Sequence, residues 1–402
     1  MLKLLQIDSC LGILSTGRIT ESIGELARAN GWETYIAHGA RYVGNSEMIS
    51  YQVSSKVEEY VHYGKSLLFD MHGLGSVSGT KRLVQWIDGI KPDIIHLHCI
   101  HGYYLNYKIL FEYLNKINIP IVWTFHDCWA FTGHCAYFDS IECIQWKSEC
   151  SNCRLKRDYP KTILKERVNA NFKLKKLLFT SCQNITIISV SFWLENLVKQ
   201  SFWRNNKVKT IHNGLDLNVF KPYIVNKEHY GLENKFVILG VAAIWDKRKG
   251  LDDFIYLSKI LDDSFSIVLV GLDDNQIKDL PYNIIGIKRT NSVQELAMLY
   301  SLADVFINPT YSDNFPTTNI EALACGTPVI TYDTGGSPEA IDIKTGRVVP
   351  LGDVRALVEE IKKLKLNPLS SDACRLRAER LYDKNERFMD YIKLYEELLK
   401  NK

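Results

Sequence analysis

The amino-acid sequence predicts an α/β protein built from two doubly wound halves. Short apolar strands alternate with helices along the chain, which is the pattern of parallel sheets. A length of 402 residues exceeds one ordinary domain. An Asn-Gly turn at 213–214, followed by Pro222 and a polar stretch, indicates a hinge. We therefore predict a first domain at 1–215, a second at 216–385 and a last helix at 386–402.

Apolar runs locate the elements of the first half. The predicted strands are 4–7, 33–38, 92–98, 120–126, 185–190 and 208–212. The predicted helices are 19–30, 79–89, 105–118 and 191–199, whereas 41–79 is expected to be irregular. His98 and the pair His126-Asp127 follow strands, at the sheet edge where parallel sheets bind ligands. Capping the core is the alternative role of each histidine.

The second half repeats this alternation. Its predicted strands are 236–241, 266–270, 304–308, 328–331 and 346–349, and its predicted helices are 251–261, 292–303, 353–364, 371–382 and 386–399. A basic loop, 242–250, follows the first of these strands. The two halves are expected to bind a ligand between them.

The stretch 311–339 carries the chemistry around which the second half is organised. Pro316 begins a short helix and Gly326 lies just past its end. Asp313 and Glu321 flank the start of that helix, where unpaired N–H groups favour an anion. Arg248 and Lys249 add cations in the preceding loop. Cations with N–H donors suit a diphosphate and carboxylates suit sugar hydroxyls, so a nucleotide-sugar fits both.

Composition excludes several classes of protein. The apolar content of 46% and charged content of 24% are those of a soluble globular chain. The formal charge of +3 is too small to indicate a nucleic-acid partner. No apolar run is long enough to span a bilayer, and the first residues predict a strand instead of a signal peptide. Ten cysteines without a secretory signal predict a cytoplasmic protein.

A cysteine-rich insertion at 128–153 interrupts the α/β pattern. The gap between Cys150 and Cys153 is that of a zinc ligand pair, and Cys135 with Cys143 could supply two more thiolates. This predicts a structural zinc, because four thiolates leave no open position for catalysis. Reduced cysteines that only pack are the alternative.

The next segment, 154–179, is strongly basic. It holds nine Lys/Arg against two Asp/Glu above an apolar stripe of Leu164, Val168 and Phe172. A basic amphipathic helix can lie against an anionic membrane surface or a phosphorylated acceptor. A solvated helix face is the alternative.

Several ordered motifs resemble glycosyltransferase family 4, whose members are retaining enzymes with a GT-B fold. Its acidic pair separated by seven residues stands here as Asp313 and Glu321. The sequences at 321–330, 335–339, 213–216 and 249–250 match the family's trailing helix, glycine turn, hinge and Lys-Gly motifs. The sequences at 15–18 and 126–135 are similar to the branch that builds bacterial exopolysaccharide, capsule and O-antigen, including colanic acid transferases.

The resemblance implies a role for each matching residue. Asp313 contacts the transferred sugar, and His126 lies beside it as the second catalytic residue. Glu321 holds the donor ribose. The remaining donor-binding residues are Gly17, Arg248, Lys249, Asn314, Thr317 and Thr318. The GT-B fold implies two facing Rossmann-like domains, with the last helix crossing back onto the first domain.

The reaction that the resemblance implies is transfer of a hexose from a nucleotide-sugar to a glycan, or a lipid-linked glycan, with retention at the anomeric carbon. The leaving diphosphate accepts the acceptor's proton, so no cofactor is required. The protein is expected in the cytoplasm, with a peripheral contact to the inner membrane surface through 154–179.

Two departures from the family keep other functions open. Asp313 is one methylene shorter than the family's Glu, and Ile244 stands where the family has an Arg, which Arg248 could replace. A catalytically silent partner subunit of a polysaccharide-assembly complex is therefore the alternative from another class. A nucleotide-sugar epimerase or a sugar phosphorylase is the alternative within the GT-B fold.

Overall fold

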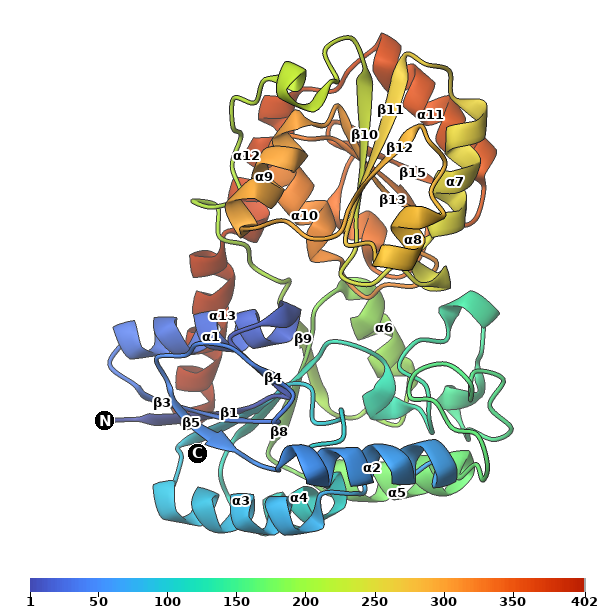
Figure 1. Cartoon of the computed structure of the whole chain (residues 1–402). Helices are drawn as coiled ribbons and strands as arrows, with labels where there is room; N and C mark the ends of the chain where they lie inside the picture. Colours follow the sequence, from blue (N-terminus) through green and yellow to red (C-terminus); the bar gives the residue numbers. More distant parts are fainter. Residues whose placement is uncertain (401–402) are drawn as a thin grey trace. The chain divides into compact units, whose positions relative to one another are not determined.

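The computed structural model describes residues 1–400, which divide into two compact units (Figure 1). The first unit is Met1–His212 with Asn385–Lys402, and the second is Asn213–Lys384. The boundary follows His212, a few residues before the predicted 215/216.

A parallel seven-stranded sheet forms the centre of the first unit. Its order is β5 (Ile49–Gln52), β3 (Glu33–His38), β1 (Lys3–Ile7), β6 (Ile94–Leu97), β7 (Ile121–Phe125), β8 (Ile185–Ser189) and β9 (Lys207–Thr210). The helices are α1 (Leu14–Ala29), α2 (Lys56–Phe69), α3 (Val77–Ile90), α4 (Tyr107–Leu114), α5 (Val168–Thr180) and α6 (Phe192–Gln200). A small sheet pairs β2 (Cys10–Leu11) with β4 (Tyr42–Val43). Counted along the chain, the first six strands have the Rossmann order 3-2-1-4-5-6.

The second unit repeats the Rossmann order in a six-stranded parallel sheet. Its strands are β12 (Ile284–Ile287), β11 (Phe265–Val270), β10 (Phe236–Val241), β13 (Val305–Asn308), β14 (Val329–Tyr332) and β15 (Gly346–Val349). The helices are α7 (Leu251–Ile260), α8 (Asp274–Lys278), α9 (Val293–Leu302), α10 (Thr317–Ala324), α11 (Val354–Leu366) and α12 (Ser371–Tyr382). Apolar side chains of the strands pack with α7 and α11 to form its core.

The last helix, α13 (Lys384–Lys400), packs on the first unit, as the GT-B resemblance implies. Phe388, Ile392 and Tyr395 lie in one buried cluster with strand and α1 side chains. The Tyr395 hydroxyl lies 2.6 Å from His96 Nδ1, while His96 Nε2 lies 2.8 Å from Thr124 Oγ1. Burial holds the pKa of His96 well below its usual value, so the ring is neutral. A neutral imidazole has one donor and one acceptor nitrogen and can satisfy both hydroxyls.

Three sequence expectations were wrong in detail. Residues 41–79 are not irregular, because α2 begins behind a Ser55 capping box. The first helix begins at Leu14 instead of 19, so residues 15–18 are helical and not a loop. The basic segment is not one helix: α5 begins only at Val168, and Leu164 is exposed in the preceding loop.

Replacing Tyr395 tests the packing of α13. We expect Tyr395→Ala to lower the free energy of unfolding of the first unit by about 3–5 kcal/mol, because a large buried ring is lost. Tyr395→Phe keeps the ring and should cost about 1–3 kcal/mol, because His96 loses a buried partner. Urea unfolding followed by tryptophan fluorescence is suitable, since seven of the eight tryptophans lie in this unit. Wild-type stability in Tyr395→Ala would contradict the packing.

Candidate active site

Three loops that follow neighbouring strands of the second unit carry the predicted donor-binding residues. β10 pairs with β13, and β13 pairs with β14, all in parallel. Their carboxyl ends therefore lie at one edge of the sheet, where ligands of such sheets bind. The loop after β10 contains a 3-10 turn at Lys247–Lys249, the loop after β13 leads into α10, and the turn after β14 contains Gly335.

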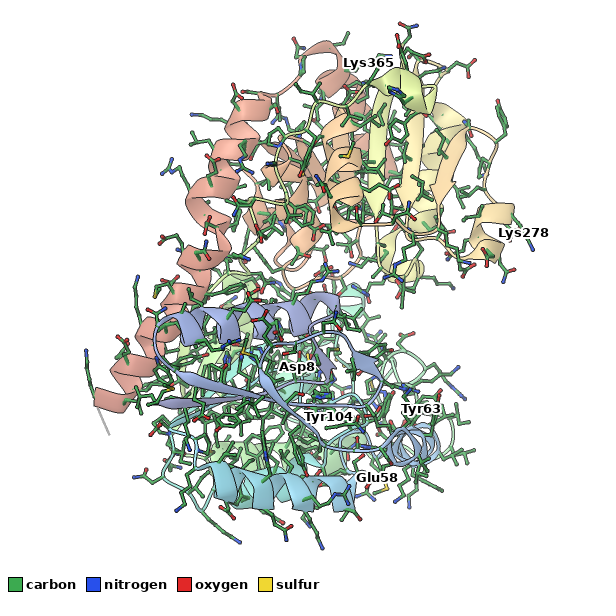
Figure 2. All side chains as sticks on the ribbon, turned by 60° about the vertical axis from the view of Figure 1, so that its left-hand side comes forward. Asp8, Glu58, Tyr63, Tyr104, Lys278 and Lys365 are labelled. Atoms are coloured by element: carbon green, nitrogen blue, oxygen red, sulfur yellow. The ribbon has the colours of Figure 1, made fainter. Side chains whose placement is uncertain are left out.

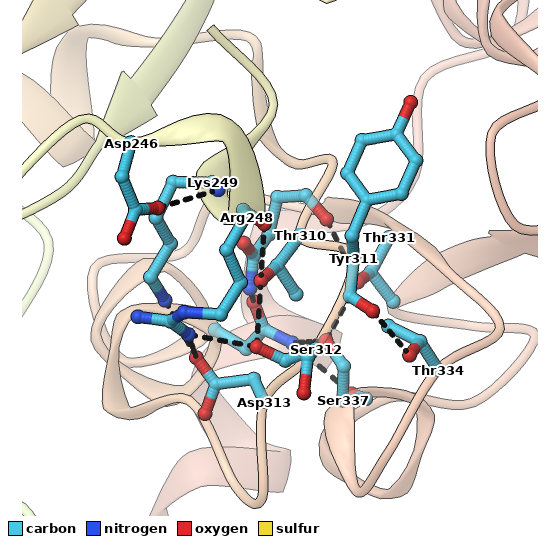
Figure 3. Close-up of polar contacts among 12 residues, drawn as sticks. Asp246, Arg248, Lys249, Thr310, Tyr311, Ser312, Asp313, Thr331, Thr334 and Ser337 are labelled. Carbon is cyan, nitrogen blue, oxygen red and sulfur yellow. Dashed lines mark hydrogen bonds and ion pairs between the residues drawn. The ribbon is translucent and has the colours of Figure 1, made fainter. Parts of the chain in front are cut away.

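Two cations meet the Asp313 carboxylate at this edge (Figure 3). Lys249 Nζ lies 2.6 Å from Asp313 Oδ2, and Arg248 Nη1 lies 3.9 Å from the same oxygen. Arg248 Nη1 also donates to the Ser312 carbonyl at 2.7 Å. All three charged side chains are less than one-third exposed. Two cations beside one carboxylate leave a local positive excess that suits an anionic ligand.

The glycine turn after β14 supports Asp313 through its backbone. Gly336 N donates to the Asp313 carbonyl at 3.1 Å. Gly335 has φ +57°, and a Cβ there would lie 1.8 Å from the same carbonyl oxygen. Only glycine allows this approach, so the Gly-Gly sequence positions the Asp313 loop.

A buried amide network fixes α10 against the strand ends. Asn308 Nδ2 donates to Asn319 Oδ1 at 2.9 Å, and Asn319 Nδ2 donates to the Ser337 carbonyl at 3.0 Å. These bonds join α10 to β13 and to the segment after the glycine turn. The first turn of α10, with Thr317 and Thr318, is thereby held beside the Asp313 loop. The network was not predicted, because its members come from a strand, a helix and a turn that only the fold brings together.

Glu321 lies in the second turn of α10 and is oriented by a tyrosine. The Tyr300 hydroxyl donates to Glu321 Oε2 at 3.0 Å. Burial, together with the charge of Glu321, holds the pKa of Tyr300 well above its usual value, so Tyr300 remains a donor. The carboxylate is accordingly held in one orientation. Tyr300 is a positioning residue that the sequence did not reveal.

The structure places Arg248, and not Ile244, beside Asp313. Ile244 is 74% exposed, whereas the Arg248 guanidinium is held by Ser312 beside Asp313. Asn314 is buried in the same loop. The second unit therefore brings together Arg248, Lys249, Asp313, Asn314 and the start of α10.

In the first unit, His126 follows β7 and pairs with His98, which follows β6. His98 Nδ1 lies 3.2 Å from His126 Nε2, and the rings are stacked. Burial lowers the pKa of His126 to about 4, against an opposing effect of Asp127. His126 is therefore neutral near pH 7. It can hydrogen-bond a hydroxyl but supplies no positive charge.

Two carboxylates lie at the same sheet edge: Asp127, which the sequence placed there beside His126, and Asp8, which was not predicted. Asp8 follows β1, and its Oδ1 accepts from Ser9 N at 2.7 Å. Burial raises the pKa of Asp8 to about 6. His101 Nε2 lies 3.0 Å from Asp127 Oδ2, and His101 lowers the pKa of Asp127 against the effect of burial. The strand-end position of Asp8 was the only signal in the sequence that could have revealed it.

Gly17 lies in the first turn of α1. A Cβ at Gly17 would lie 3.0 Å from Cys10 Cβ, so this glycine lets the helix approach β2. The glycine that needs a left-handed backbone is Gly12, with φ +62°. A contact between Gly17 and a donor phosphate stays a prediction.

The four cysteines predicted to bind zinc line one cavity of about 240 Å³. Within residues 1–400, no three His, Cys, Asp or Glu side chains converge as metal ligands would. Proximity to Cys135 lowers the pKa of the Cys153 thiol, and proximity to Cys153, together with burial, keeps the pKa of the Cys135 thiol well above its usual value. Two 3-10 turns, Asp139–Ile141 and Gln145–Lys147, flank Cys143. The four-thiolate zinc site is therefore not formed in this structure and stays a prediction.

Comparison with known families decides the class of protein. Residues 18–219 match the profile described as Glycosyltransferase Family 4, and residues 235–367 match that described as Glycosyl transferases group 1. The first match spans half of the chain. The chain belongs to glycosyltransferase family 4.

Relatives of this family 4 glycosyltransferase support the assignment. It is 24% identical to a protein of Escherichia coli named as the colanic acid biosynthesis glycosyl transferase WcaC, over 82% of each chain. It is 30% identical to an N-acetylgalactosaminyltransferase of Campylobacter jejuni that acts on N,N'-diacetylbacillosaminyl-diphospho-undecaprenol, over 49% of this chain and 56% of the relative.

Solved structures show the same fold. Sucrose-phosphate synthase from Thermosynechococcus elongatus has a TM-score of 0.72 at 17% identity, with all of both chains covered. The lipopolysaccharide glycosyltransferase WaaG has a TM-score of 0.65 at 15% identity, with 97% of this chain and 99% of that one covered. The predicted GT-B fold of two Rossmann-like domains is confirmed.

Thiol labelling and metal analysis test the cysteine cluster. We expect iodoacetamide at pH 7 to modify Cys153 before Cys150, because the Cys153 pKa is lowered while burial raises that of Cys150 to about 12. Mass spectrometry of the labelled peptides gives the order. Slow labelling of all four thiols, with about one zinc per chain that is lost in Cys153→Ser, would instead establish the four-cysteine zinc site.

Proposed function

We propose that this glycosyltransferase moves a hexose from a nucleotide-sugar to a lipid-linked glycan, with retention at the anomeric carbon, in surface polysaccharide synthesis. The observation that carries the proposal is the cluster of Lys249, Arg248 and Asp313 beside the start of α10. A diphosphate needs cations and N–H donors, and a sugar needs a carboxylate, and this edge of the sheet supplies all of them.

Each residue of the cluster has a part in the proposed reaction. Lys249 exchanges its contact with Asp313 for the donor diphosphate, and Arg248 binds the same group. Asp313 then accepts hydrogen bonds from the hydroxyls of the transferred sugar. Glu321, oriented by Tyr300, accepts from the donor ribose. Neutral His126 is proposed to contact the transferred sugar, and Gly17 the donor phosphate.

Bond breakage places negative charge on the leaving diphosphate, so stabilising that charge is the main demand on the site. Lys249 and Arg248 supply fixed positive charge, and α10 supplies N–H donors. The leaving diphosphate takes the proton of the acceptor hydroxyl, and the acceptor attacks from the same face. No protein nucleophile is needed in this scheme.

The names of relatives support the acceptor and the role. WcaC is named for colanic acid biosynthesis, CapM of Staphylococcus aureus for capsular polysaccharide biosynthesis, and the Campylobacter jejuni relative for a diphospho-undecaprenol acceptor. The structural neighbour HepE of Anabaena was solved with UDP-glucose. No helix within residues 1–400 is long and apolar enough to cross a membrane. We therefore propose peripheral contact with the inner membrane surface.

Lys249 gives the sharpest test of the proposed chemistry. We expect Lys249→Ala to lower turnover by about 100- to 1,000-fold, because one stabilising partner of the leaving group is lost. Thermal stability should change little, since the side chain lies at the partly exposed sheet edge. Lys247→Ala, on the exposed side of the same turn, is the matched control and should keep wild-type turnover. Product analysis with labelled donor is the measurement.

Three outcomes would contradict the proposal. Wild-type turnover in Lys249→Ala would show that Lys249 does not stabilise charge on the leaving diphosphate. An altered donor sugar without transfer indicates an epimerase. Absence of both turnover and donor binding by calorimetry in the wild type indicates a silent partner subunit.

A thermal-shift screen against nucleotide-sugars identifies the donor. A donor at 100 times its dissociation constant should stabilise the protein by about 2.7 kcal/mol. Glu321→Gln should weaken this stabilisation for every nucleotide that keeps its ribose, because the carboxylate no longer pairs with the hydroxyls. An unchanged donor-induced thermal shift in Glu321→Gln would show that Glu321 does not bind the ribose.

A further inference from the structure

Helix α2 has its polar residues inside and its apolar residues outside. Glu59, His62 and Ser66 are buried, whereas Val57, Tyr60, Val61 and Phe69 are exposed. Val57 is 71% exposed, Tyr60 63% and Val61 54%. A surface helix of a globular protein normally shows the opposite arrangement. Figure 2 labels Glu58 and Tyr63 on this helix.

The inward polar residues explain the orientation of the helix. Glu59 Oε1 accepts from Ala40 N at 2.5 Å and from Ser54 Oγ at 3.0 Å. His62 Nε2 accepts from Gly75 N at 3.0 Å. These bonds satisfy buried loop groups and fix which side of α2 faces the unit. Val57, Tyr60 and Val61, spaced by three and four residues, consequently share the outer face.

A second apolar segment lies against the carboxyl end of α2. Ile163 N donates to the Leu67 carbonyl at 2.8 Å, and Lys165 N donates to the Leu68 carbonyl at 3.0 Å. Leu164, between them, is 70% exposed, and Ile163 is partly exposed. We define the docking face as Val57, Tyr60 and Val61 on the outer side of α2, with Ile163 and Leu164 beside its carboxyl end. A cluster of exposed apolar side chains on a folded domain indicates an interaction site.

The charges around the docking face are mainly positive. Residues 154–165 contain five Lys/Arg and one Asp, and Lys56 and Lys65 are exposed on α2. The Arg41 guanidinium lies 5.3 Å from the Tyr60 ring. On α2 itself, Glu58 pairs with Arg82 and Glu59 is buried, while Lys156 pairs with Glu166 nearby. The remaining excess is complementary to anionic headgroups.

We propose that the docking face binds the surface of a bilayer that contains anionic phospholipid. Apolar side chains enter the boundary between headgroups and acyl chains, and the lysines contact lipid phosphates. This assigns the membrane contact to α2 and 161–165 and not to α5, where Lys175 is buried and Lys173 pairs with Glu149. The inference rests on the proposed peripheral location, but it does not require transferase activity.

Vesicle sedimentation of the full chain tests the proposal. The probes are large vesicles of phosphatidylcholine with 30% phosphatidylglycerol and vesicles of phosphatidylcholine alone. We expect the wild type to bind the anionic vesicles more tightly, and high salt to weaken that binding. Val61→Asp combined with Leu164→Asp should lower the partition coefficient by at least about tenfold. Lys161→Glu combined with Lys165→Glu should lower it about fivefold or more for each charge changed.

Matched controls lie in the second unit. Leu366→Asp changes an exposed leucine of α11, and Lys362→Glu an exposed lysine of the same helix. Both should bind vesicles like the wild type, and melting curves should show that every variant folds. The proposal is overturned if the wild type does not bind anionic vesicles. It is also overturned if the variants of the docking face bind these vesicles as well as the two control variants do. It is also overturned if the variants instead dissociate a dimer seen by sedimentation velocity.

The donor thermal shift separates this inference from the proposed function. Loss of vesicle binding with an unchanged donor shift supports the docking face. Vesicle binding by a wild-type chain that binds no donor would overturn the proposed function and leave the docking face standing.

Discussion

Parallel pairing of neighbouring strands is the constraint on which both candidate sites depend. In a parallel sheet every strand ends at the same edge, so loops that are far apart in sequence meet there. In the second unit this brings the loops after β10, β13 and β14 together around Asp313. In the first unit it gathers Asp8, His98 and His126 after β1, β6 and β7. The same backbone geometry therefore creates one partly exposed site with two cations and one enclosed site in which neutral imidazoles lie beside carboxylates.

The difference between those sites arises from burial. Asp8 and His126 are enclosed, and enclosure shifts the pKa of each toward its uncharged form. Lys249, Arg248 and Asp313 keep contact with solvent and with each other, so their charges are retained at low cost. Partly exposed cations suit a charged diphosphate, whereas enclosed imidazoles and carboxylates suit the hydroxyls of an uncharged sugar.

Sequence reasoning located what depends on local pattern and missed what depends on long-range contact. Buried strands of parallel sheets are continuous apolar runs, so most were found within a residue or two. Helix α2 was not predicted because its apolar residues face outward and its polar residues face inward, which is the reverse of the usual amphipathic pattern. Tyr300 and the Asn308–Asn319 pair were missed because their partners lie elsewhere in the chain. The zinc site that the cysteine spacing predicts stays a prediction, because spacing alone does not determine how four side chains converge.

The packing of α13 on the first unit has a consequence for how the protein is made. The core of that unit contains side chains from the first residues of the chain and from the last helix. The strands of the first unit leave the ribosome long before α13 is synthesised. Until α13 packs on the sheet, part of the sheet's apolar surface is uncovered. The second unit, by contrast, is continuous in sequence and can fold as it emerges. Completion of the first-made domain is therefore delayed until α13 has been synthesised.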